Sequence, residues 1–137
     1  MIILDTNVIS ELLKPQPDMR VQTWILDMHE VEISTTVVTI SEIEYGLQRL
    51  PVGQRKNNLY KKFGDFIYPL HIFPFDELSA RETGRFRATR EKLGLSCNAS
   101  DMMIAGIASK AGVDVATRNI KGFDQLPIKL INPWVLF

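Results

Sequence analysis

Apolar residues along the chain follow two spacings, one typical of buried strands and one typical of helices. Ile2 to Leu4 form a short, fully apolar run, which suits a strand buried on both faces. Further strands are predicted at residues 31–36, 70–73, 113–117 and 129–131. Between the strands, helical spacing of apolar residues or capping residues predict helices at about 6–13, 21–28, 39–50, 59–67, 76–94 and 98–112.

This alternation of strands and helices predicts an α/β fold, with a mostly parallel central sheet of about five strands flanked by helices. The 137 residues are the size of one domain, so we expect a single domain over residues 1–137. Parallel sheets of this kind bind ligands outside the carboxyl ends of their strands, at a topological switch point. The strand-to-helix junctions are therefore the places to look for a functional site.

Three carboxylates and one amide lie at or near these junctions. Asp5 follows the first strand, Glu42 lies in the first turn of the third helix, Asp101 lies in the first turns of the helix that begins near Asn98, and Asn119 follows the fourth strand. Mg²⁺ and Mn²⁺ prefer carboxylate, amide and water oxygens, and a bound cation relieves the repulsion between gathered carboxylates. The pattern favours a divalent-cation site.

Each of these residues also has a purely structural explanation. Asp5 is a possible surface cap of the first helix, although the helix can also be capped by Thr6. Glu42 fits a capping box with Thr39, since the two residues are three apart. Asp101 can complement the helix dipole, and Asn119 can be a turn residue that tolerates a left-handed backbone.

Composition excludes several other classes of site and protein. The single Cys97 rules out an internal disulfide framework, and two separated histidines leave no His-rich metal cluster, so a bound metal would need oxygen ligands. The chain has no phosphate-binding glycine loop, no HExxH motif and no GxSxG motif. No apolar run approaches the roughly 20 residues that cross a membrane, and no signal peptide is evident, so we expect a cytoplasmic protein without a membrane partner.

Charge is unevenly distributed, although the net charge is zero. Residues 1–50 hold three basic and eight acidic side chains, a net charge of −5, and residues 51–92 hold nine basic and five acidic side chains, a net charge of +4. Acidic and basic surfaces are therefore expected on different parts of the molecule. The alternative is that the charges merely solvate helix faces.

Five segments together resemble the PIN-domain proteins, and among them the VapC/FitB-type toxin ribonucleases of bacterial type II toxin–antitoxin modules. These segments are MIILDTNVISELL at the amino end, TISEIEYG at 39–46, SCNASDMMIAGIA at 96–108, VATRNIKGF at 115–123 and INPW at 131–134. The resemblance covers essentially the whole chain.

The resemblance implies an Mg²⁺- or Mn²⁺-dependent endoribonuclease that cleaves RNA phosphodiesters. The acidic quartet of the family falls on Asp5, Glu42, Asp101 and, at its fourth position, Asn119. Asp5 and Asp101 are implied as the principal metal ligands, Glu42 as a residue that helps to hold metal or orient water, and Asn119 with Thr117 as residues that position phosphate or a water ligand. Many relatives carry an acid where this chain has Gly122, so a second metal ion would lack that ligand here.

The resemblance also gives meaning to the basic stretch and implies partners. Side chains of this stretch could hold the RNA backbone beside the acidic groove, namely Arg81, Arg85, Arg87, Arg90 and Lys92. The alternative is that Glu77 pairs with Arg81, and Arg87 with Glu91, within one helix. A cognate antitoxin protein is implied, and its inserted arginine or lysine could silence the acidic site. A homodimer is implied too, and apolar residues such as Trp24, Phe66 and Trp134 favour it.

Two other functions remain open on the sequence alone. One is a PIN-fold RNA-processing nuclease outside any toxin–antitoxin pair. The other is a catalytically silent nucleic-acid-binding or dimerisation module that keeps the fold. The three intact acids argue against the silent module.

Overall fold

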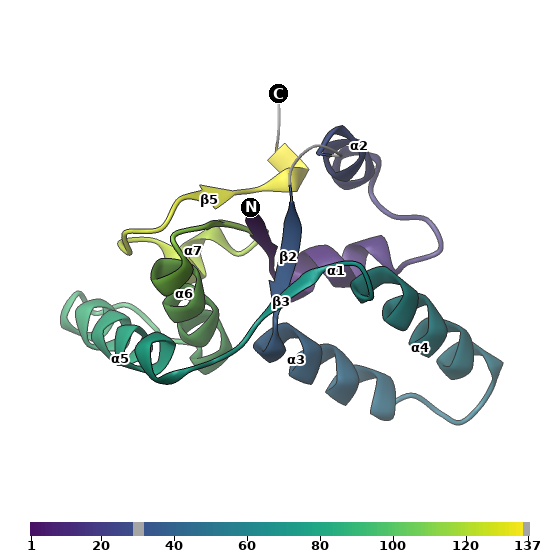
Figure 1. Cartoon of the computed structure of the whole chain (residues 1–137), viewed down its shortest axis with the longest axis horizontal. Helices are drawn as coiled ribbons and strands as arrows, with labels where there is room; N and C mark the ends of the chain where they lie inside the picture. The colour runs from purple at the N-terminus through teal and green to yellow at the C-terminus, as the bar shows by residue number, and fades with distance from the viewer. Residues whose placement is uncertain (29–31, 136–137) are drawn as a thin grey trace.

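The core of the molecule is a five-stranded sheet in which every pair of neighbouring strands is parallel (Figure 1). The computed structural model describes residues 1–28 and 32–135. The strands are β1 (Ile2–Leu4), β2 (Ile33–Thr36), β3 (His71–Phe73), β4 (Asp114–Ala116) and β5 (Leu130–Ile131), in the order β3-β2-β1-β4-β5. The predicted α/β fold is confirmed, and Val31 of the second predicted strand lies outside the described residues.

Helices connect the strands, because adjacent parallel strands need crossover connections. They are α1 (Thr6–Leu12), α2 (Met19–Asp27), α3 (Val37–Gln48), α4 (Gln54–Ile67), α5 (Glu77–Lys92), α6 (Ala99–Ala111) and α7 (Ile120–Phe123), with a 3₁₀ turn at Pro133–Val135. The six predicted helices are all present, whereas α7 and the 3₁₀ turn were not predicted. No helix in the described part of the chain is long and apolar enough to cross a membrane.

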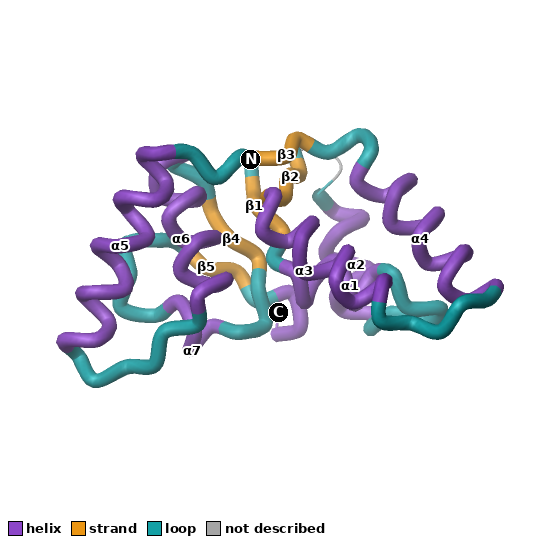
Figure 2. The backbone as a smooth tube through the Cα atoms, turned by 90° about the horizontal axis from the view of Figure 1, so that it is seen from below, coloured by secondary structure: helices purple, strands orange, loops and turns teal. Residues whose placement is uncertain are grey.

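Alternate residues of β1 supply the hydrophobic cores on the two faces of the sheet. Ile2 and Leu4 pack in one core with residues of α1 to α4, and Ile3 packs in the other with residues of α5 and α6. Figure 2 shows these two groups of helices on opposite sides of the strands. Trp24 and Trp134 are buried in the first core and Phe66 packs against it, so these residues do not indicate a dimer surface.

The beginnings of two helices differ from the predictions. The side chain of Asp5, not Thr6, caps α1 by accepting a hydrogen bond from the backbone N–H of Thr6. The helix α3 begins at Val37, and the Thr36 hydroxyl caps it by accepting from the N–H of Thr39. Glu42 therefore lies in the second turn of α3, and the proposed capping box with Thr39 is wrong.

Candidate active site

The sheet topology brings the predicted site residues to one edge of the sheet. The first strand, β1, lies at the centre, and the chain leaves it toward β2 on one side and later returns to β4 on the other. Asp5 follows β1 and Thr117 follows β4, so both stand at the carboxyl ends of adjacent parallel strands. This is the topological switch point at which sheets of this class bind ligands.

Asp5 is held rigidly at the floor of the site. It is 3% exposed, and one carboxylate oxygen caps α1 through the N–H of Thr6 at 2.7 Å. The other oxygen accepts hydrogen bonds from the Thr117 hydroxyl at 2.7 Å and from the Asn7 amide at 3.2 Å. Asp5 is thus a helix cap, as the structural alternative stated, but it is buried and not on the surface.

Glu42 reaches the same edge from α3. Its Oε1 accepts a hydrogen bond of 2.7 Å from the hydroxyl of Thr6, which directly follows Asp5 in the chain. The Thr6 hydroxyl also lies 3.1 Å from that of Thr39, one turn before Glu42. Thr6 therefore joins α1 to α3 and fixes the position of the Glu42 carboxylate.

Asp101 and Asn119 meet across the amino end of α6. Asp101 is in the first turn of α6, where its backbone N–H donates to the capping side chain of Asn98. Its Oδ2 accepts a hydrogen bond of 2.9 Å from the side-chain amide of Asn119. Asn119 has a φ of −89°, so the alternative of a left-handed turn residue is wrong.

Gly122 borders this contact between Asp101 and Asn119. A Cβ atom at position 122 would lie 2.5 Å from Asp101 Oδ2 and 2.3 Å from Asn119 Nδ2. Such distances are too short for any side chain unless its neighbours move. The missing side chain at position 122 therefore leaves the space that the Asn119 amide occupies. Asp124, two residues on, pairs with Arg90 at 2.8 Å.

The carboxylates are close enough to perturb one another. Burial raises the pKa of Asp5, against the lowering effect of its hydrogen bonds, and the charge of Glu42 raises it further. Burial, followed by the charges of Asp5 and Glu42, raises the pKa of Asp101 to about 6. The Asn119 amide and the charge of Arg90 lower the pKa of Asp101 by smaller amounts. The cluster is thus a region of unfavourable negative charge, which a cation would stabilise.

The raised pKa of Asp101 predicts a pH-dependent cost in stability for the metal-free protein. Because the pKa is about 6 in the folded state and 3.8 in the reference state, the folded chain binds the proton more tightly. Stability should therefore fall as the pH rises from about 4 to 7. After allowance for partial exposure, the contribution of Asp101 is about 1 kcal/mol.

Denaturant unfolding of wild type and Asp101→Asn in EDTA, across this pH range, isolates the contribution. The variant should become the more stable protein as the pH rises through 6. A stability difference that does not change between pH 4 and 7 would contradict the pKa assignment.

Thr117 and Asn7 organise the site from within. The Thr117 side chain is fully buried, and its hydroxyl contacts Asp5, the Asn7 amide and the backbone N–H of Asn119. The Thr117 hydroxyl thus orients Asp5, and its role in positioning phosphate or a water ligand stays a prediction. Asn7, like Thr6, was missed, although its place two residues after Asp5 is a sequence signal for an amide that supports that carboxylate.

The arginines of α5 support the alternative of ion pairs within the helix more than they support contact with the RNA backbone. Arg81 pairs with Glu77 at 3.0 Å, Arg87 pairs with Glu91 at 3.1 Å, and Arg85 pairs with Glu82. Arg90 is buried and bonded to protein groups, so its predicted contact with RNA is wrong.

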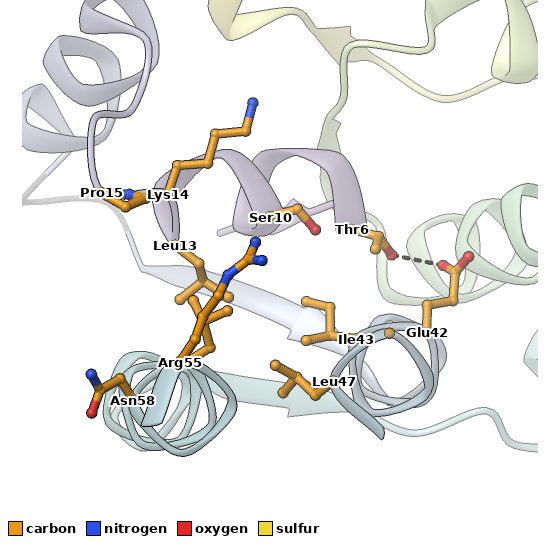
Figure 3. A pocket seen from close by; sticks show the side chains of 12 residues that line it. Thr6, Ser10, Leu13, Lys14, Pro15, Glu42, Ile43, Leu47, Arg55 and Asn58 are labelled. Carbon is orange, nitrogen blue, oxygen red and sulfur yellow. Dashed lines mark hydrogen bonds between the residues drawn. The ribbon is translucent and has the colours of Figure 1, made fainter. Parts of the chain in front are cut away.

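A pocket of about 580 Å³ adjoins the acidic cluster between α1, α3 and α4. Thr6 and Glu42 form one end of this pocket, and Lys14, Pro15, Arg55 and Asn58 lie toward the other (Figure 3). The walls between the two ends are largely apolar, with Leu13, Ile43, Leu47 and Leu59 among the lining residues. The pocket therefore joins an acidic end to an apolar channel with basic residues near its far end.

Comparison with known proteins identifies the family. The model of the PIN domain matches residues 2–129. The chain belongs to the PIN domain family, among the VapC- and FitB-type toxins. This PIN domain is 36% identical to toxin FitB of Neisseria gonorrhoeae over 98% of the chain and 99% of that protein. It is 34% identical to VapC ribonuclease Y4jK of Sinorhizobium fredii over 98% of both chains.

Solved structures share the whole fold of this PIN domain. The crystal structure of FitAcB from Neisseria gonorrhoeae contains a chain that matches with a TM-score of 0.91 at 36% identity, over 99% of this chain and 100% of that one. A chain in the DNA-bound VapBC structure from Salmonella typhimurium matches with a TM-score of 0.82 at 25% identity, over 96% and 97%. The resemblance noted from the sequence is thereby confirmed.

Proposed function

We propose that this protein is a divalent-cation-dependent endoribonuclease and the toxin of a type II toxin–antitoxin pair. The observation that carries the proposal is the convergence of Asp5, Glu42, Asp101 and Asn119 on one edge of the sheet. The proximity of Asp5 and Asp101 does not stabilise the fold, because both carboxylates are desolvated and their charges repel. Sequence similarity to a VapC ribonuclease and to toxin FitB supports the same activity.

The donor set fits Mg²⁺ or Mn²⁺. Within residues 1–28 and 32–135, no three acidic, His or Cys side chains lie close enough together to hold one ion. Two carboxylates with water and substrate oxygens are a usual ligand set for Mg²⁺, so Asp5 and Asp101 would be the direct protein ligands. A bound ion supplies positive charge to the phosphate in the transition state and increases the acidity of water.

The remaining residues act around these ligands. Thr117 and Asn7 donate hydrogen bonds to Asp5, which orient its carboxylate and favour the ionised form against the effect of burial. Glu42, fixed by Thr6, orients a water molecule for in-line attack and accepts a proton from it. Asn119 holds Asp101 and presents its amide at the exposed rim, where it can donate to a phosphate oxygen.

Incubation of purified protein with total RNA tests this function. Cleavage with Mg²⁺ or Mn²⁺, its loss in EDTA and internal cut sites on mapping would support an endoribonuclease. RNA binding without cleavage under every metal condition would instead support the catalytically silent module. An RNA-processing role outside a toxin–antitoxin pair would follow if no gene for a small DNA-binding partner lies beside this one.

The partner is proposed to be an antitoxin whose carboxyl-terminal segment occupies the pocket between α1, α3 and α4. Apolar side chains of such a segment match the lining by Leu13 and Leu47, and an arginine or lysine would reach Glu42 at the acidic end. The inserted cation would substitute for the charge of the metal. The toxin itself is proposed to act in the cytoplasm as a homodimer.

Antitoxin affinity in EDTA should fall about tenfold or more for Glu42→Gln, because the inserted cation loses its charged partner. The matched control is Glu44→Gln, two residues along α3, where the glutamate bonds to Tyr60 and does not line the pocket. Calorimetric titration measures both. Equal affinities for wild type and Glu42→Gln would mean that the partner does not contact the acidic site.

A further inference from the structure

Arg90 is a buried cation outside the acidic cluster. It lies in the last turn of α5 and is 1% exposed, whereas the neighbouring arginines of that helix are exposed and pair with glutamates. A buried guanidinium is costly unless all its donors are satisfied, and a well-packed apolar side chain is often at least as stabilising. Its presence here calls for a role other than packing.

All five N–H donors of Arg90 have an acceptor. The acceptors are the backbone oxygen of Ser96, twice, at 3.3 and 2.9 Å, that of Lys121 at 3.1 Å, that of Asp124 at 2.7 Å, and the Asp124 carboxylate at 2.8 Å. Four of these five bonds go to backbone oxygens. The guanidinium therefore fixes the path of the main chain in two separate segments.

Both of these segments position residues of the candidate active site, Asp101 in one case and Asn119 in the other. Ser96 lies two residues before Asn98, the cap of α6, whose side chain accepts from the N–H of Asp101. Lys121 and Asp124 flank Gly122 and belong to the short segment that opens at Asn119. Arg90 thus links the start of the helix that bears Asp101 to the turn that bears Asn119.

The separation of these two segments is tightly constrained at the site. The Asn119 amide contacts Asp101 Oδ2 at 2.9 Å, and the position of a Cβ atom on Gly122 is only 2.5 Å from the same oxygen. A small shift of the 119–124 segment toward α6 would bring it into collision with Asp101. A small shift away would break the bond between Asn119 and Asp101.

We propose that Arg90 is a positioning residue of the active site, which holds α7 against the amino end of α6 and so fixes Asn119 on Asp101. The proposal rests on the proposed nuclease function for its kinetic consequence. The structural consequence, at the Asn119 side chain, does not depend on RNA or metal.

The first test is spectroscopic and uses the metal-free protein. In Arg90→Met, the side-chain amide signals of Asn119, assigned from the spectrum of Asn119→Ala, should shift and exchange faster with water. Val21→Ala is the control, because Val21 is fully buried in the other core and its loss destabilises the fold without touching α6 or α7. Asn119 signals that are unchanged in Arg90→Met would overturn the proposal.

The second test is steady-state cleavage of a mapped RNA. Arg90→Met should lower kcat about tenfold with KM changed less than about twofold, since misplacement of a catalytic group by a fraction of an ångström has effects of this order. Val21→Ala, assayed well below its Tm, should keep the wild-type kcat. An unchanged kcat in folded Arg90→Met would overturn the proposal, whereas inactive wild type would instead count against the nuclease function.

Asp124→Ala keeps the proposal testable if Arg90→Met does not fold. Asp124 is about half exposed, so its truncation removes one bond of Arg90 and little packing. The Asn119 amide should exchange faster in this variant, and kcat should fall about threefold, in proportion to one lost charge-assisted bond. Asn119 signals identical to those of wild type would refute the role assigned to Arg90.

Discussion

Asp5→Asn and Asp101→Asn should each lower the rate of RNA cleavage by about a thousandfold or more while the protein stays folded. Each substitution removes one of the two negative charges that would hold the metal ion, and the amide that replaces it is a weak ligand for Mg²⁺. Position 122, which borders Asn119, is a glycine and so supplies no carboxylate that could take over.

The two variants should differ in stability. Asp101 is partly exposed and is bonded to the Asn119 amide, so Asp101→Asn mainly relieves repulsion and should leave the metal-free protein at least as stable. Asp5 is buried and accepts bonds from Thr117 and Asn7, so Asp5→Asn sets an amide against the amide of Asn7. Asp5→Asn should therefore lower the Tm modestly.

Single-turnover cleavage and thermal unfolding on the same preparations separate these effects. Asp114→Asn is the matched control, because Asp114 is the first residue of β4 and lies at the opposite edge of the same sheet. The control should cleave as fast as wild type. Full metal-dependent activity in either Asp5→Asn or Asp101→Asn would remove that residue from the site.

Glu42→Gln should reduce cleavage about a hundredfold, an effect typical of losing a general base, with little change in Tm. The glutamine keeps an Oε1 that can accept from the Thr6 hydroxyl, so the local bonding survives. Since Thr36 caps α3, no capping bond depends on Glu42. The variant therefore loses only the negative charge.

Glu44→Gln on the same helix again serves as the control and should retain wild-type activity. Measurement of rate and Tm together is decisive for Glu42. A nearly neutral effect of Glu42→Gln on the rate would show that Glu42 has a structural role only.

The sequence predicts that the acidic residues gather at one edge of the sheet. The apolar pattern locates the strands, and the parallel topology then determines which side chains at the strand ends lie together. The apolar run from Ile2 to Leu4 suits a buried strand, and this places Asp5 at its carboxyl end. Asn98 or Ser100 as a cap and Gly112 as a stop predict the bounds of α6 and place Asp101 in its first turns, and the structure shows that Asn98 is the cap. These residues are far apart in the sequence, but the rule that ligands bind at the carboxyl ends of parallel strands already predicts that they meet at one edge of the sheet.

Other features depend on competition between neighbouring residues. Both Thr36 and Thr39 can cap a helix, and the β-branched Val37 and Val38 favour a strand locally, so the sequence predicts that α3 starts at Thr39, whereas it starts at Val37. The short α7 has too few residues for a helical period to show. In these two places tertiary contacts, not local preference, decide the structure.

Arg90 is a case in which a usable signal was present. Ser79, Phe86 and Arg90 are the buried residues of α5, and their spacing of seven and four places them on one helix face. An arginine in register with a buried phenylalanine is a candidate for burial, whereas Arg81 and Arg87 are off that face. Only the structure shows that Ser96, Lys121 and Asp124 supply its acceptors.

The most direct test of the account is the metal dependence of single-turnover cleavage of one mapped RNA by the wild-type protein. The account predicts no cleavage in EDTA and a rate that rises to saturation as Mn²⁺ or Mg²⁺ is added. It also predicts that Asp101→Asn stays inactive across the same titration. Cleavage at an equal rate in EDTA, or in Asp101→Asn, would contradict a cation-dependent site built on these carboxylates.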